Sequence, residues 1–479
     1  MKKFYILIYA VFFISQLTPA QSPTPIPTKQ QLDWHDMEFY LFTHFGPNTF
    51  TDKEWGEGTE KEEIFNPTNL NCMQWCKVAK AAGAKGIIIT AKHHDGFCLW
   101  PSKFSTHTVR ESKWKNGKGD VLKELAAACK AYGLKFGVYL SPWDRNHPDY
   151  GTPKYNDVFV NMMTEIFTNY GPIWELWWDG ANGEGPNGKK QIYDWQRFKK
   201  TVKKLSPNTV IFSDIGPQIR WVGNEKGIAG TTNYNTLDTA GFNAGIGAPP
   251  VDTLNAGNQN GKVWVPAECD VSIRPGWFYH KEEDDKVKSP EDLFSLYLKS
   301  VGRGATMLLN VPPDRTGRIH ENDAAALVGF KKLRTESFKN NLCKNADASI
   351  VSGVNIKKAN FLIDNNSNTF ITVENIEKDK IKIHFKNPVQ LNCVVLKEFI
   401  RDGQSAQKFN IEIISKDNLE TFTHSTIGHK RIITFPEREA TDIFISFLES
   451  KQAVKISEVG AYLIEEGLVE KEEVIIREK

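Results

Sequence analysis

The chain has 479 residues, of which 40% are hydrophobic and 25% are charged, and its formal net charge is +2. This composition excludes a disordered or fibrous protein, and the length is sufficient for two or three domains. A charge so close to neutral gives no electrostatic reason to expect nucleic acid or an anionic membrane as a partner. The seven cysteines form no C-x-x-C pair, so neither a zinc ribbon nor a dense disulfide framework is expected.

Residues 1–20 have the three parts of a secretory signal peptide. Lys2 and Lys3 precede an apolar run over residues 4–14, and the small-residue end follows at Thr18-Pro19-Ala20. We expect cleavage after Ala20 and an exported protein, either periplasmic or secreted. No other segment approaches the roughly 18 apolar residues that a membrane span requires, so no span is expected.

After a Pro-rich linker, strand-like apolar runs alternate with helix-like stretches. Helices are expected between the strands, for example over residues 73–82 and 121–132, and a glycine follows each of these two. The alternation predicts a (β/α)8-like barrel as the catalytic domain, over residues 21–340. Its eight predicted strands are 39–45, 86–92, 134–141, 173–179, 209–213, 228–233, 263–268 and 306–311.

From about Cys343 the pattern changes to short alternating segments separated by turns. Such a pattern predicts an antiparallel β-sandwich, which we assign to residues 341–465. Its predicted strands are 380–385, 393–399, 409–415, 431–435, 443–448 and 454–463. Residues 466–479 are mostly charged and are expected to form a tail. The fold class is therefore α/β, a barrel followed by a C-terminal sandwich.

A barrel of this kind carries its chemistry where the strands end and the following loops begin. Polar and aromatic residues stand at five of the expected strand ends: 43–46, 92–96, 138–143, 179 and 268–270. The fourth is the most distinctive, because the apolar run Trp177-Trp178 closes on Asp179 and a Gly-rich loop follows. A carboxylate beside tryptophans suits a sugar site, whereas a helix N-cap is the structural alternative, and this stretch alone leaves both open.

Other chemistries have weaker support in the sequence. His93-His94 with Asp95 suggests a metal site, but adjacent residues on a strand point to opposite faces, so no metal is expected there. Neutral imidazoles can instead bind sugar hydroxyls, because they both donate and accept hydrogen bonds. The chain has no G-x-S-x-G elbow, Walker loop or dinucleotide fingerprint, and we expect no cofactor. Carboxylates with aromatics and histidines are the groups that glycoside hydrolysis uses.

The sequence resembles the family 29 glycoside hydrolases, the α-L-fucosidases, over roughly residues 30–335. The residues that carry the resemblance are His44-Phe45-Gly46, Glu54-Trp55, Ala91-Lys92-His93-His94-Asp95-Gly96-Phe97, Phe136-Gly137-Val138-Tyr139, Trp177-Trp178-Asp179-Gly180 and Leu308-Leu309-Asn310-Val311-Pro312-Pro313. The resemblance implies retaining cleavage of α-L-fucosides, with Asp179 as the nucleophile. It also implies fucose contacts by His44, Glu54, Trp55, His93, His94, Tyr139 and Trp177.

The acid/base carboxyl is less well defined by the resemblance, because its position differs between branches of the family. The segment 264–270 followed by Arg274-Pro275-Gly276-Trp277 resembles the branch that prefers α-1,3 and α-1,4 linkages, which implies Glu268 as the acid/base. The rival hypothesis is that Asp270, Glu184 or Glu225 supplies the proton. The sandwich resembles a discoidin-like domain through residues 361–365 and 368–370, and structural support of the barrel is expected rather than sugar binding.

The leading interpretation is an exported, exo-acting, retaining α-L-fucosidase that acts on fucosylated oligosaccharides or glycoconjugates. One alternative is a hydrolase of a related sugar such as an α-L-galactoside. The other is a non-hydrolytic glycan-binding protein that has kept the pocket but lost turnover. The presence of both proposed carboxylates, Asp179 and Glu268, argues against the latter.

Overall fold

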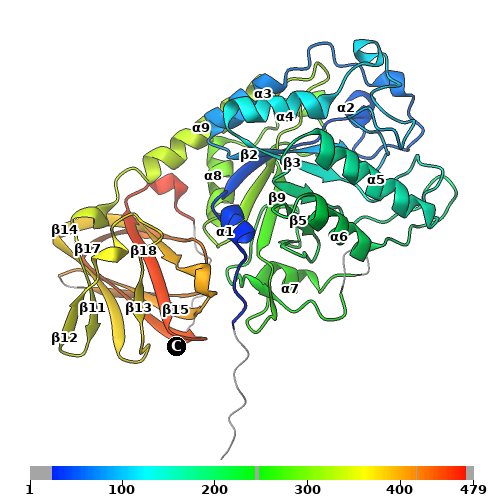
Figure 1. The fold of residues 1–479 in the computed structure, drawn as a ribbon. Coiled ribbons are helices and arrows are strands. Elements are labelled where there is room, and N and C mark those ends of the chain that lie inside the picture. The colour runs from blue at the N-terminus through cyan, green and yellow to red at the C-terminus, as the bar shows by residue number, and fades with distance from the viewer. Residues whose placement is uncertain (1–23, 243–246, 417, 471–479) are drawn as a thin grey trace, which may run out of the picture.

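The computed structural model describes residues 24–242, 247–416 and 418–470. Two bodies lie side by side, a parallel barrel and an antiparallel sheet domain (Figure 1). The predicted signal peptide over residues 1–20 lies outside the described residues, as does the part of the predicted tail over residues 471–479. No helix in the described ranges is long and apolar enough to cross a bilayer.

Eight parallel strands close into a barrel in the order β1-β10-β9-β6-β5-β4-β3-β2. The strands are β1 (Phe39–Thr43), β2 (Gly86–Lys92), β3 (Lys135–Leu140), β4 (Glu175–Trp177), β5 (Val210–Ser213), β6 (Ile219–Trp221), β9 (Ala267–Ser272) and β10 (Thr306–Asn310). The predicted barrel is thus confirmed, and six of its strands fall within the predicted ranges. A two-stranded antiparallel ladder, β7 (Thr236–Leu237) with β8 (Val263–Trp264), stands apart from the barrel.

The helices begin and end at residues that the local sequence explains. Asn71 caps the start of α3 and Asp120 caps the start of α4, and Gly83 and Gly133 end these helices at φ 73° and 65°. Glycine suits both ends because L side chains are strained at positive φ. The helices are α1 (Lys29–His35), α2 (Pro47–Thr51), α3 (Cys72–Ala82), α4 (Val121–Tyr132), α5 (Lys154–Asn169), α6 (Trp195–Leu205), α7 (Val251–Ala256), α8 (Pro290–Lys299) and α9 (Glu321–Ser337).

The predicted sixth strand, over residues 228–233, is wrong. The sixth barrel strand is β6, which the sequence obscures because a charged residue, Arg220, stands at its centre. Arg220 is buried and donates to the backbone carbonyls of Leu254, Val265 and Tyr234. Residues 228–233 instead face the second domain, where the Asn233 N–H donates to Thr426 Oγ1.

The predicted seventh strand, over residues 263–268, is displaced. Val263–Trp264 belongs to β8, and the barrel strand β9 begins only after Pro266, whose ring nitrogen has no proton to donate to a ladder. Glu268 is therefore the second residue of β9 and not its last. The expectation that Glu268 ends a strand on the same face as Asp179 is wrong.

The barrel interior is filled by side chains that alternate along each strand. Its apolar members form one buried cluster: Trp34, Met37, Tyr40, Phe42, Ile88, Tyr139, Trp177, Val210, Phe212, Ile219 and Leu308. Glu175 stands two residues before Trp177, and Glu268 accepts a hydrogen bond from the Trp177 indole, so both carboxyls share this interior. An apolar core with two glutamates in it is unusual.

The second domain is an antiparallel sheet with strand order β12-β11-β14-β17-β15-β16, in which β18 pairs with β14 and β13. Its strands are β11 (Asp347–Ser352), β12 (Asn355–Lys358), β13 (Ile371–Val373), β14 (Asp379–Glu398), β15 (Ala406–Ile414), β16 (Leu419–Ser425), β17 (Arg431–Ser450) and β18 (Val454–Tyr462). β14 and β17 each unite two predicted strands, and the ladder between them shifts register around Pro388. Residues from both halves of β14 pack in one core.

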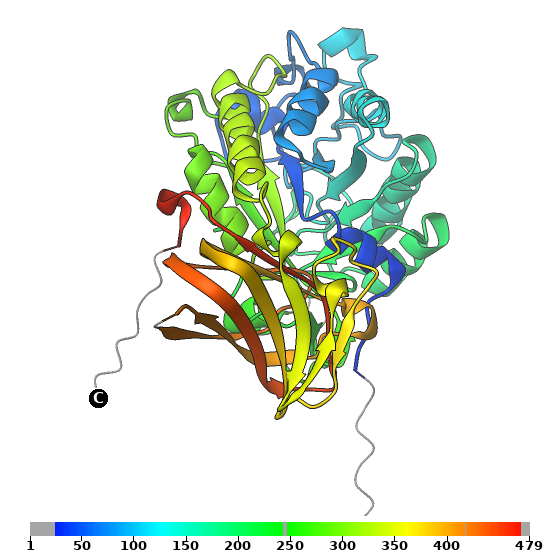
Figure 2. The ribbon, with the colours of Figure 1, turned by 90° about the vertical axis from the view of Figure 1, so that its left-hand side faces the viewer.

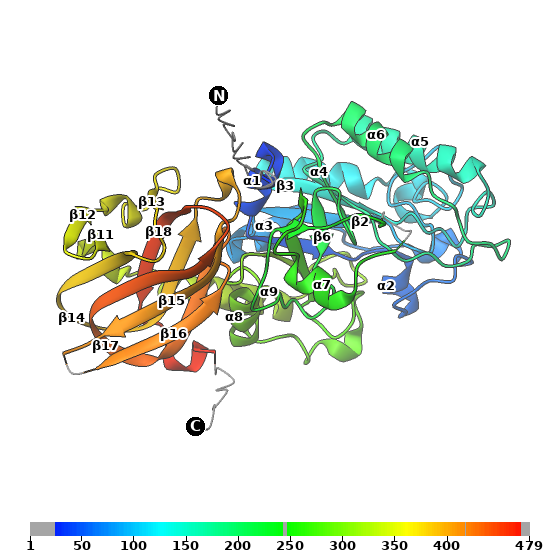
Figure 3. The ribbon, with the colours of Figure 1, turned by 90° about the horizontal axis from the view of Figure 1, so that it is seen from below.

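The two domains form a shared apolar contact on the side of the barrel that carries α8 and α9 (Figures 2 and 3). Val395 and Ile432 of the sheet domain belong to the same buried cluster as residues of α8 and α9. At its edge, Lys430 pairs with Glu38 at 2.5 Å and the Ile432 N–H donates to the Gly302 carbonyl. The sheet domain therefore packs against α8 and α9 and bonds to residues that precede β1 and β10.

We expect Leu308→Ala to lower the free energy of unfolding by about 2–5 kcal/mol, because Leu308 is fully buried inside the barrel and its loss leaves a cavity. Val328→Ala on α9 is the control, since half of the Val328 side chain is exposed, and it should change stability by less than about 0.5 kcal/mol. Urea unfolding followed by circular dichroism measures both. Equal losses would contradict the assignment of Leu308 to the core.

Candidate active site

The carboxyl ends of the barrel strands gather most of the predicted site residues. His44 follows β1, His93 and His94 follow β2, Tyr139 lies near the end of β3, and Asp179 comes two residues after β4. Trp177 is the last residue of β4 and stacks on Tyr139. From the loop after α2, the Trp55 ring lies 5.4 Å from that of His94, and Glu54 bonds to the loop after β9. Glu268 is the exception.

Two donors fix the carboxylate of Asp179. The Tyr139 hydroxyl donates to Oδ2 at 3.1 Å, and the Ala181 N–H donates to Oδ1 at 2.7 Å. The Asp179 side chain is 27% exposed, so it remains open to a ligand. The helix N-cap alternative is excluded, because the first helix after Asp179 is α6, which begins at Trp195 and is capped by Asp194. Asp179 is thus an oriented carboxylate at the mouth of the barrel.

Gly180, next to Asp179, adjoins a second carboxyl. A Cβ at this position would lie 2.0 Å from Oδ2 of Asp214, which follows β5, so a side chain here would displace that carboxyl. Burial, with a contribution from the negative charge of Asp179, raises the pKa of Asp214 to about 6. The sequence did not reveal Asp214, although its place directly after a predicted strand was a usable signal.

His94 is held in one tautomer with a free lone pair toward Asp179. The Ser141 hydroxyl donates to the Trp143 carbonyl, so it accepts from His94 Nδ1 at 2.8 Å. Burial lowers the pKa of His94 and keeps the ring neutral. His94 Nε2 then carries no proton and stands 3.8 Å from Asp179 Oδ2, where two acceptors face each other. A ligand hydroxyl is the group that both atoms can bind.

His44 is oriented in the same manner by Asn310 at the end of β10. The Asn310 carbonyl oxygen accepts from His44 Nδ1 at 2.9 Å and from the His44 backbone N–H at 3.1 Å. The Asn310 amide nitrogen donates to Ser272 and to the Trp277 carbonyl, which fixes the amide orientation. Burial lowers the pKa of His44 to about 4. His44 Nε2 is therefore an acceptor as well.

His93 completes a row of three imidazoles. Its ring lies 4.2 Å from that of His94 and 5.7 Å from those of His44 and Tyr139, and it stacks on the Tyr139 ring. Burial and the neighbouring His94 lower the pKa of His93 well below its usual value. Its Nδ1 is buried and has no hydrogen-bond partner in the part of the chain that the structure describes. A cluster of neutral imidazoles with free nitrogens suits a ligand rich in hydroxyl groups.

Aromatic side chains form the floor and the rim of the site. In the floor, the Trp177 ring stacks on Phe212 at 4.0 Å and on Tyr139 at 5.2 Å. At the rim, Trp55 is 54% exposed and packs edge-on against Trp143 at 5.5 Å. An exposed tryptophan beside a polar pocket is a typical platform for the apolar face of a sugar.

Glu54 binds the loop after β9 rather than pointing freely into the site. Its carboxylate accepts from the backbone N–H groups of Trp277 and Phe278 at 2.8 and 3.1 Å, and from His280 Nε2 at 2.7 Å. His280 also bonds Asp52 through Nδ1 at 2.8 Å. These contacts join the loops that carry Trp55 and Trp277. A direct fucose contact by Glu54 stays a prediction.

Glu268 lies beneath the floor of the site. Its side chain is fully buried, the Trp177 indole N–H donates to Oε1 at 2.8 Å, and the Tyr40 hydroxyl donates to Oε2. Glu268 pairs in register with Thr306, the first residue of β10, so it belongs to the amino-terminal level of the barrel. The acid/base role that the resemblance implies for Glu268 would require a strand-end position, and Glu268 does not have one.

Two of the rival carboxyls stand closer to the mouth. Asp270 is two residues further along β9 and accepts from the Trp221 indole at 2.9 Å; burial and the charge of Glu225 raise its pKa well above the usual range. Glu225 is exposed on the loop after β6 and accepts from the Trp277 indole at 3.1 Å. The Trp277 ring lies 5.1 Å from that of His44, so Glu225 borders the site.

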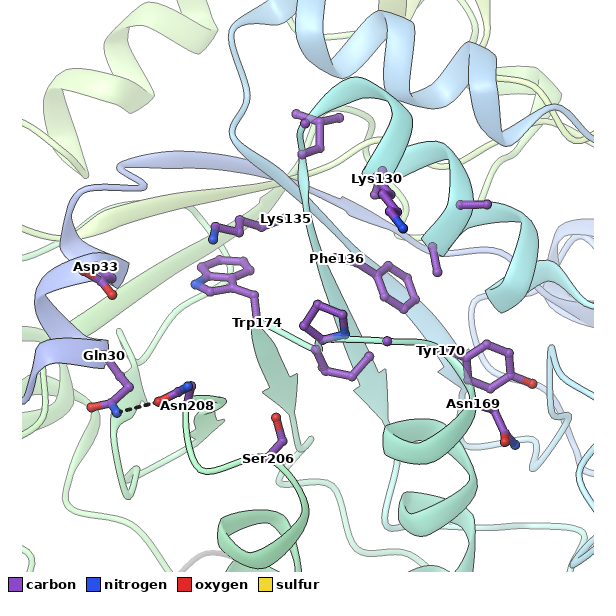
Figure 4. Close-up of a pocket in the computed structure, with 18 of the residues that line it drawn as sticks. Gln30, Asp33, Lys130, Lys135, Phe136, Asn169, Tyr170, Trp174, Ser206 and Asn208 are labelled. Carbon is purple, nitrogen blue, oxygen red and sulfur yellow. Dashed lines mark hydrogen bonds between the residues drawn. The ribbon is translucent and has the colours of Figure 1, made fainter.

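A cavity of about 1520 Å³ opens at the opposite end of the barrel. Its lining comes from α1, from α4 and from the segments that lead into β3, β4 and β5, and the Trp174 indole is drawn beside Lys135 (Figure 4). These are amino-terminal ends of strands, where barrel enzymes do not carry their chemistry. Among the described residues, no group of three or more His, Cys, Asp or Glu side chains is arranged to hold a metal ion.

We expect the stability of the protein to fall in acid through His44. Its pKa is about 4 in the fold against 6.5 as the ordinary value, so between these values the unfolded chain binds more protons and stability falls as the pH falls. Asn does not titrate in this window. Relative to His44→Asn, the free energy of unfolding of the wild type should therefore fall by about 1.4 kcal/mol for each pH unit of acidification. Urea unfolding at pH 4.5, 5.5 and 6.5 measures the difference. Parallel pH profiles of the two proteins would contradict a neutral buried His44.

The comparisons with known proteins identify the family of the chain. The family model described as "Alpha-L-fucosidase" matches residues 22–332. Alpha-L-fucosidase 1 of Arabidopsis thaliana is 40% identical over 448 residues, which cover 90% of this chain and 87% of the plant protein.

Two solved structures cover nearly the whole chain. A glycoside hydrolase 29 family member from an unknown rumen bacterium is 41% identical with a TM-score of 0.82, covering 95% of this chain and 79% of that one. A Ruminococcus gnavus GH29 fucosidase, solved in complex with fucose, is 30% identical with a TM-score of 0.83, covering 94% and 98%. The chain therefore belongs to the α-L-fucosidase family, family 29 of the glycoside hydrolases.

Proposed function

We propose that this α-L-fucosidase is an exo-acting retaining enzyme that releases L-fucose from fucosylated glycans by double displacement. The observation that carries the proposal is the carboxylate of Asp179, which two donors orient at the mouth of the barrel beside the free lone pair of His94. A fixed, partly exposed carboxylate suits attack on an anomeric carbon, because its position needs no reorganisation.

The substrate pocket is proposed to consist of the imidazoles and the aromatic rings. His44, His93 and His94 are neutral and buried, and each has a ring nitrogen available for a sugar hydroxyl. Trp55, Trp177 and Tyr139 supply apolar faces, which suit the methyl group that fucose carries where most hexoses carry a hydroxymethyl. This pairing of acceptors with aromatic surface is the basis for proposing fucose as the sugar in the site.

In the proposed mechanism, Asp179 attacks the anomeric carbon while an acidic group protonates the leaving oxygen. The fucosyl–Asp179 ester then forms, and the same group, now a base, removes a proton from the water that hydrolyses it. Each displacement inverts the anomeric centre, so the released fucose keeps the configuration of the substrate. The Tyr139 hydroxyl and the Ala181 N–H stabilise the Asp179 carboxylate before attack and after its release.

We propose Glu225 rather than Glu268 as the acid/base. The proton must reach the glycosidic oxygen and later be taken from water, so the group needs access to solvent. Glu268 is fully buried below Trp177, whereas Glu225 is exposed and its carboxylate is oriented by the Trp277 indole. Asp270 lies between the two and is buried, which disfavours exchange of a proton with water.

The linkage preference and the location are further parts of the proposal. The segment that ends in Arg274-Pro275-Gly276-Trp277 supports α-1,3 and α-1,4 linkages by resemblance, and its Trp277 borders the site beside His44.

Residues 1–20 support export to the periplasm or the medium. N-terminal sequencing of protein recovered outside the cytoplasm checks the export, with Gln21 expected as the first residue.

We expect Glu225→Ala to lose about 10²–10⁴-fold in kcat/KM on α-1,3/1,4-fucosylated oligosaccharides but far less on an aryl fucoside, because only a poor leaving group needs the proton. Azide should restore turnover and give a fucosyl azide of retained configuration. Asp179→Ala should lose activity on both substrates, and azide should give the inverted product. Product configuration is read by NMR.

Asp270→Asn and Glu225→Gln serve as controls in the same assay. If Glu225→Ala is folded but loses activity equally on both substrate types and does not respond to azide, Glu225 is not the acid/base. An Asp270→Ala protein that shows the azide response instead would transfer the role to Asp270. A wild-type protein that binds fucosylated glycans without releasing fucose would contradict the proposed function itself.

A further inference from the structure

Two glutamates occupy the amino-terminal level of the barrel interior. Glu175 is the first residue of β4 and Glu268 the second residue of β9, and both side chains are fully buried. The two carboxyls are within hydrogen-bonding reach of each other. Two carboxylates so close together in an apolar interior cannot both be ionised without a large energetic cost.

The donors around this pair are distributed unequally. Glu268 accepts from the Tyr40 hydroxyl at Oε2 and from the Trp177 indole at Oε1. The Trp34 indole N–H donates to the Tyr40 oxygen at 3.0 Å. Neither oxygen of Glu175 therefore receives a hydrogen bond from an N–H or O–H group of the described residues. A buried carboxylate without a donor is unstable, whereas a protonated carboxyl in that place becomes a donor itself.

We propose that Glu175 and Glu268 share one proton as a carboxylic acid–carboxylate pair, and that the pair is a positioning element that holds the Trp177 indole in the floor of the substrate pocket. Glu175 carries the proton and donates it in a hydrogen bond to Glu268. Glu268 then accepts three hydrogen bonds, from Tyr40, Trp177 and Glu175, which together support its negative charge. The positioning role rests on the proposed function of the site above it.

The groups that face the pair from the surrounding elements fit this assignment. They are Trp34 from α1, Tyr40 from β1, Trp177 from β4, Asp270 further along β9 and Thr306 from β10, and none of them is a cation. Burial and the charge of Glu268 raise the pKa of Glu175 well above its ordinary value. Burial also raises the pKa of Glu268, but the hydrogen bonds from Tyr40, Glu175 and Trp177 oppose the shift. The proton therefore belongs on Glu175.

The pair is connected to the proposed nucleophile through a column of rings. Trp177 is clamped between Phe212 and Tyr139 and anchored at its indole nitrogen by Glu268. Tyr139, at the other end of the stack, donates to Asp179. A rotation of the indole would move both the floor that the sugar contacts and the tyrosine that orients the carboxylate. The charge on Glu268 gives the indole N–H a strong, directional acceptor that prevents this rotation.

Infrared spectroscopy of the unliganded protein tests the proton directly and does not depend on turnover. At pH 7 we expect the carbonyl stretch of a protonated, hydrogen-bonded carboxylic acid in the difference between wild type and Glu175→Gln. In Glu268→Gln the same band should persist at a shifted frequency, because Glu175 keeps its proton but donates it to an amide oxygen instead of a carboxylate. Asp270→Asn identifies any band from that buried carboxyl.

Kinetics test the positioning role with matched substitutions. Glu175→Gln keeps a donor toward Glu268 and should keep kcat/KM on fucosylated oligosaccharides within about threefold. Glu175→Met removes the donor, and Glu268→Gln weakens the acceptor for Trp177; each should raise KM about 10-fold or more with a smaller change in kcat. Glu398→Gln is the control, since Glu398 is a buried glutamate of the sheet domain that accepts from Ser405 and Gly428. It should lower stability without changing KM.

The outcomes separate the proposal from its alternatives. A Glu175→Gln spectrum identical to wild type, or loss of the band in Glu268→Gln, would overturn the shared proton. Equal effects of Glu175→Gln and Glu175→Met on KM would overturn the donor role. If Glu268→Gln does not fold, the difference between the wild-type and Glu175→Gln spectra decides whether Glu175 carries the proton. If the protein shows no fucosidase turnover, the proposed function fails, while the infrared result still establishes or excludes the shared proton.

Discussion

The hydrogen bond from the Tyr139 hydroxyl to Asp179 joins the barrel core to the mouth of the site. Tyr139 is almost completely buried and stacked on Trp177, which is itself stacked on Phe212. The position of the carboxylate is therefore set by the packing of three large rings and not by the conformation of a loop. Ring stacks in a closely packed interior move little, so the carboxylate is held in place before any substrate arrives.

The polar part of the site follows from the protonation states that burial imposes. Burial favours neutral imidazoles, and Asn310 and Ser141 then fix which ring nitrogens of His44 and His94 carry the proton. The nitrogens left over are acceptors, which face the ligand space near Asp179. A site with an oriented carboxylate, neutral acceptors and aromatic faces is chemically suited to an uncharged sugar.

Most of the architecture was predictable, because a strand that is buried only by other parts of the barrel shows its burial as a run of apolar residues in the sequence. The strands β1, β2 and β4 follow this rule, and so do α3 and α4, which are followed by Gly83 and Gly133. The rule failed at β6, where Arg220 is buried but satisfied by backbone carbonyls that come from distant segments. It also failed over residues 228–233, where Ala229 packs against residues of the barrel and Asn233 bonds to the sheet domain.

The site was less predictable than the fold, for a physical reason. Side chains such as His44, His94 and Asp179 belong to motifs beside strand ends, whereas the second carboxyl depends on where a strand begins. Pro266 delays the start of β9, and this displacement moves Glu268 from the mouth of the barrel into its core. Asn310 and Trp277 act through long-range hydrogen bonds that no local pattern encodes, whereas Asp214 directly follows a predicted strand.

The Trp177 indole lies between the carboxyl groups of Asp179 and Glu268. Above it, Asp179 is partly exposed and bound by a tyrosine and a backbone N–H; below it, Glu268 is fully buried and bound by an indole and a tyrosine. One tryptophan thus separates a carboxylate that can meet substrate from one that cannot. This separation explains why the two carboxyls, which come from the loop after β4 and from β9 on different sides of the barrel, have different roles.

The most direct measurement of the central claim is covalent trapping with 2-deoxy-2-fluoro-L-fucosyl fluoride, followed by peptide mass mapping. The fluorine at C2 slows both formation and hydrolysis of the fucosyl–enzyme ester, but the anomeric fluoride is a good leaving group and keeps formation fast. The ester therefore accumulates, and the attacking residue retains the label. We predict one label per chain on the peptide that contains Asp179, and none in Asp179→Asn. A label on Asp214 or Glu225, or turnover of fucosides with inversion of configuration and no label, would contradict the assignment of Asp179 as the nucleophile.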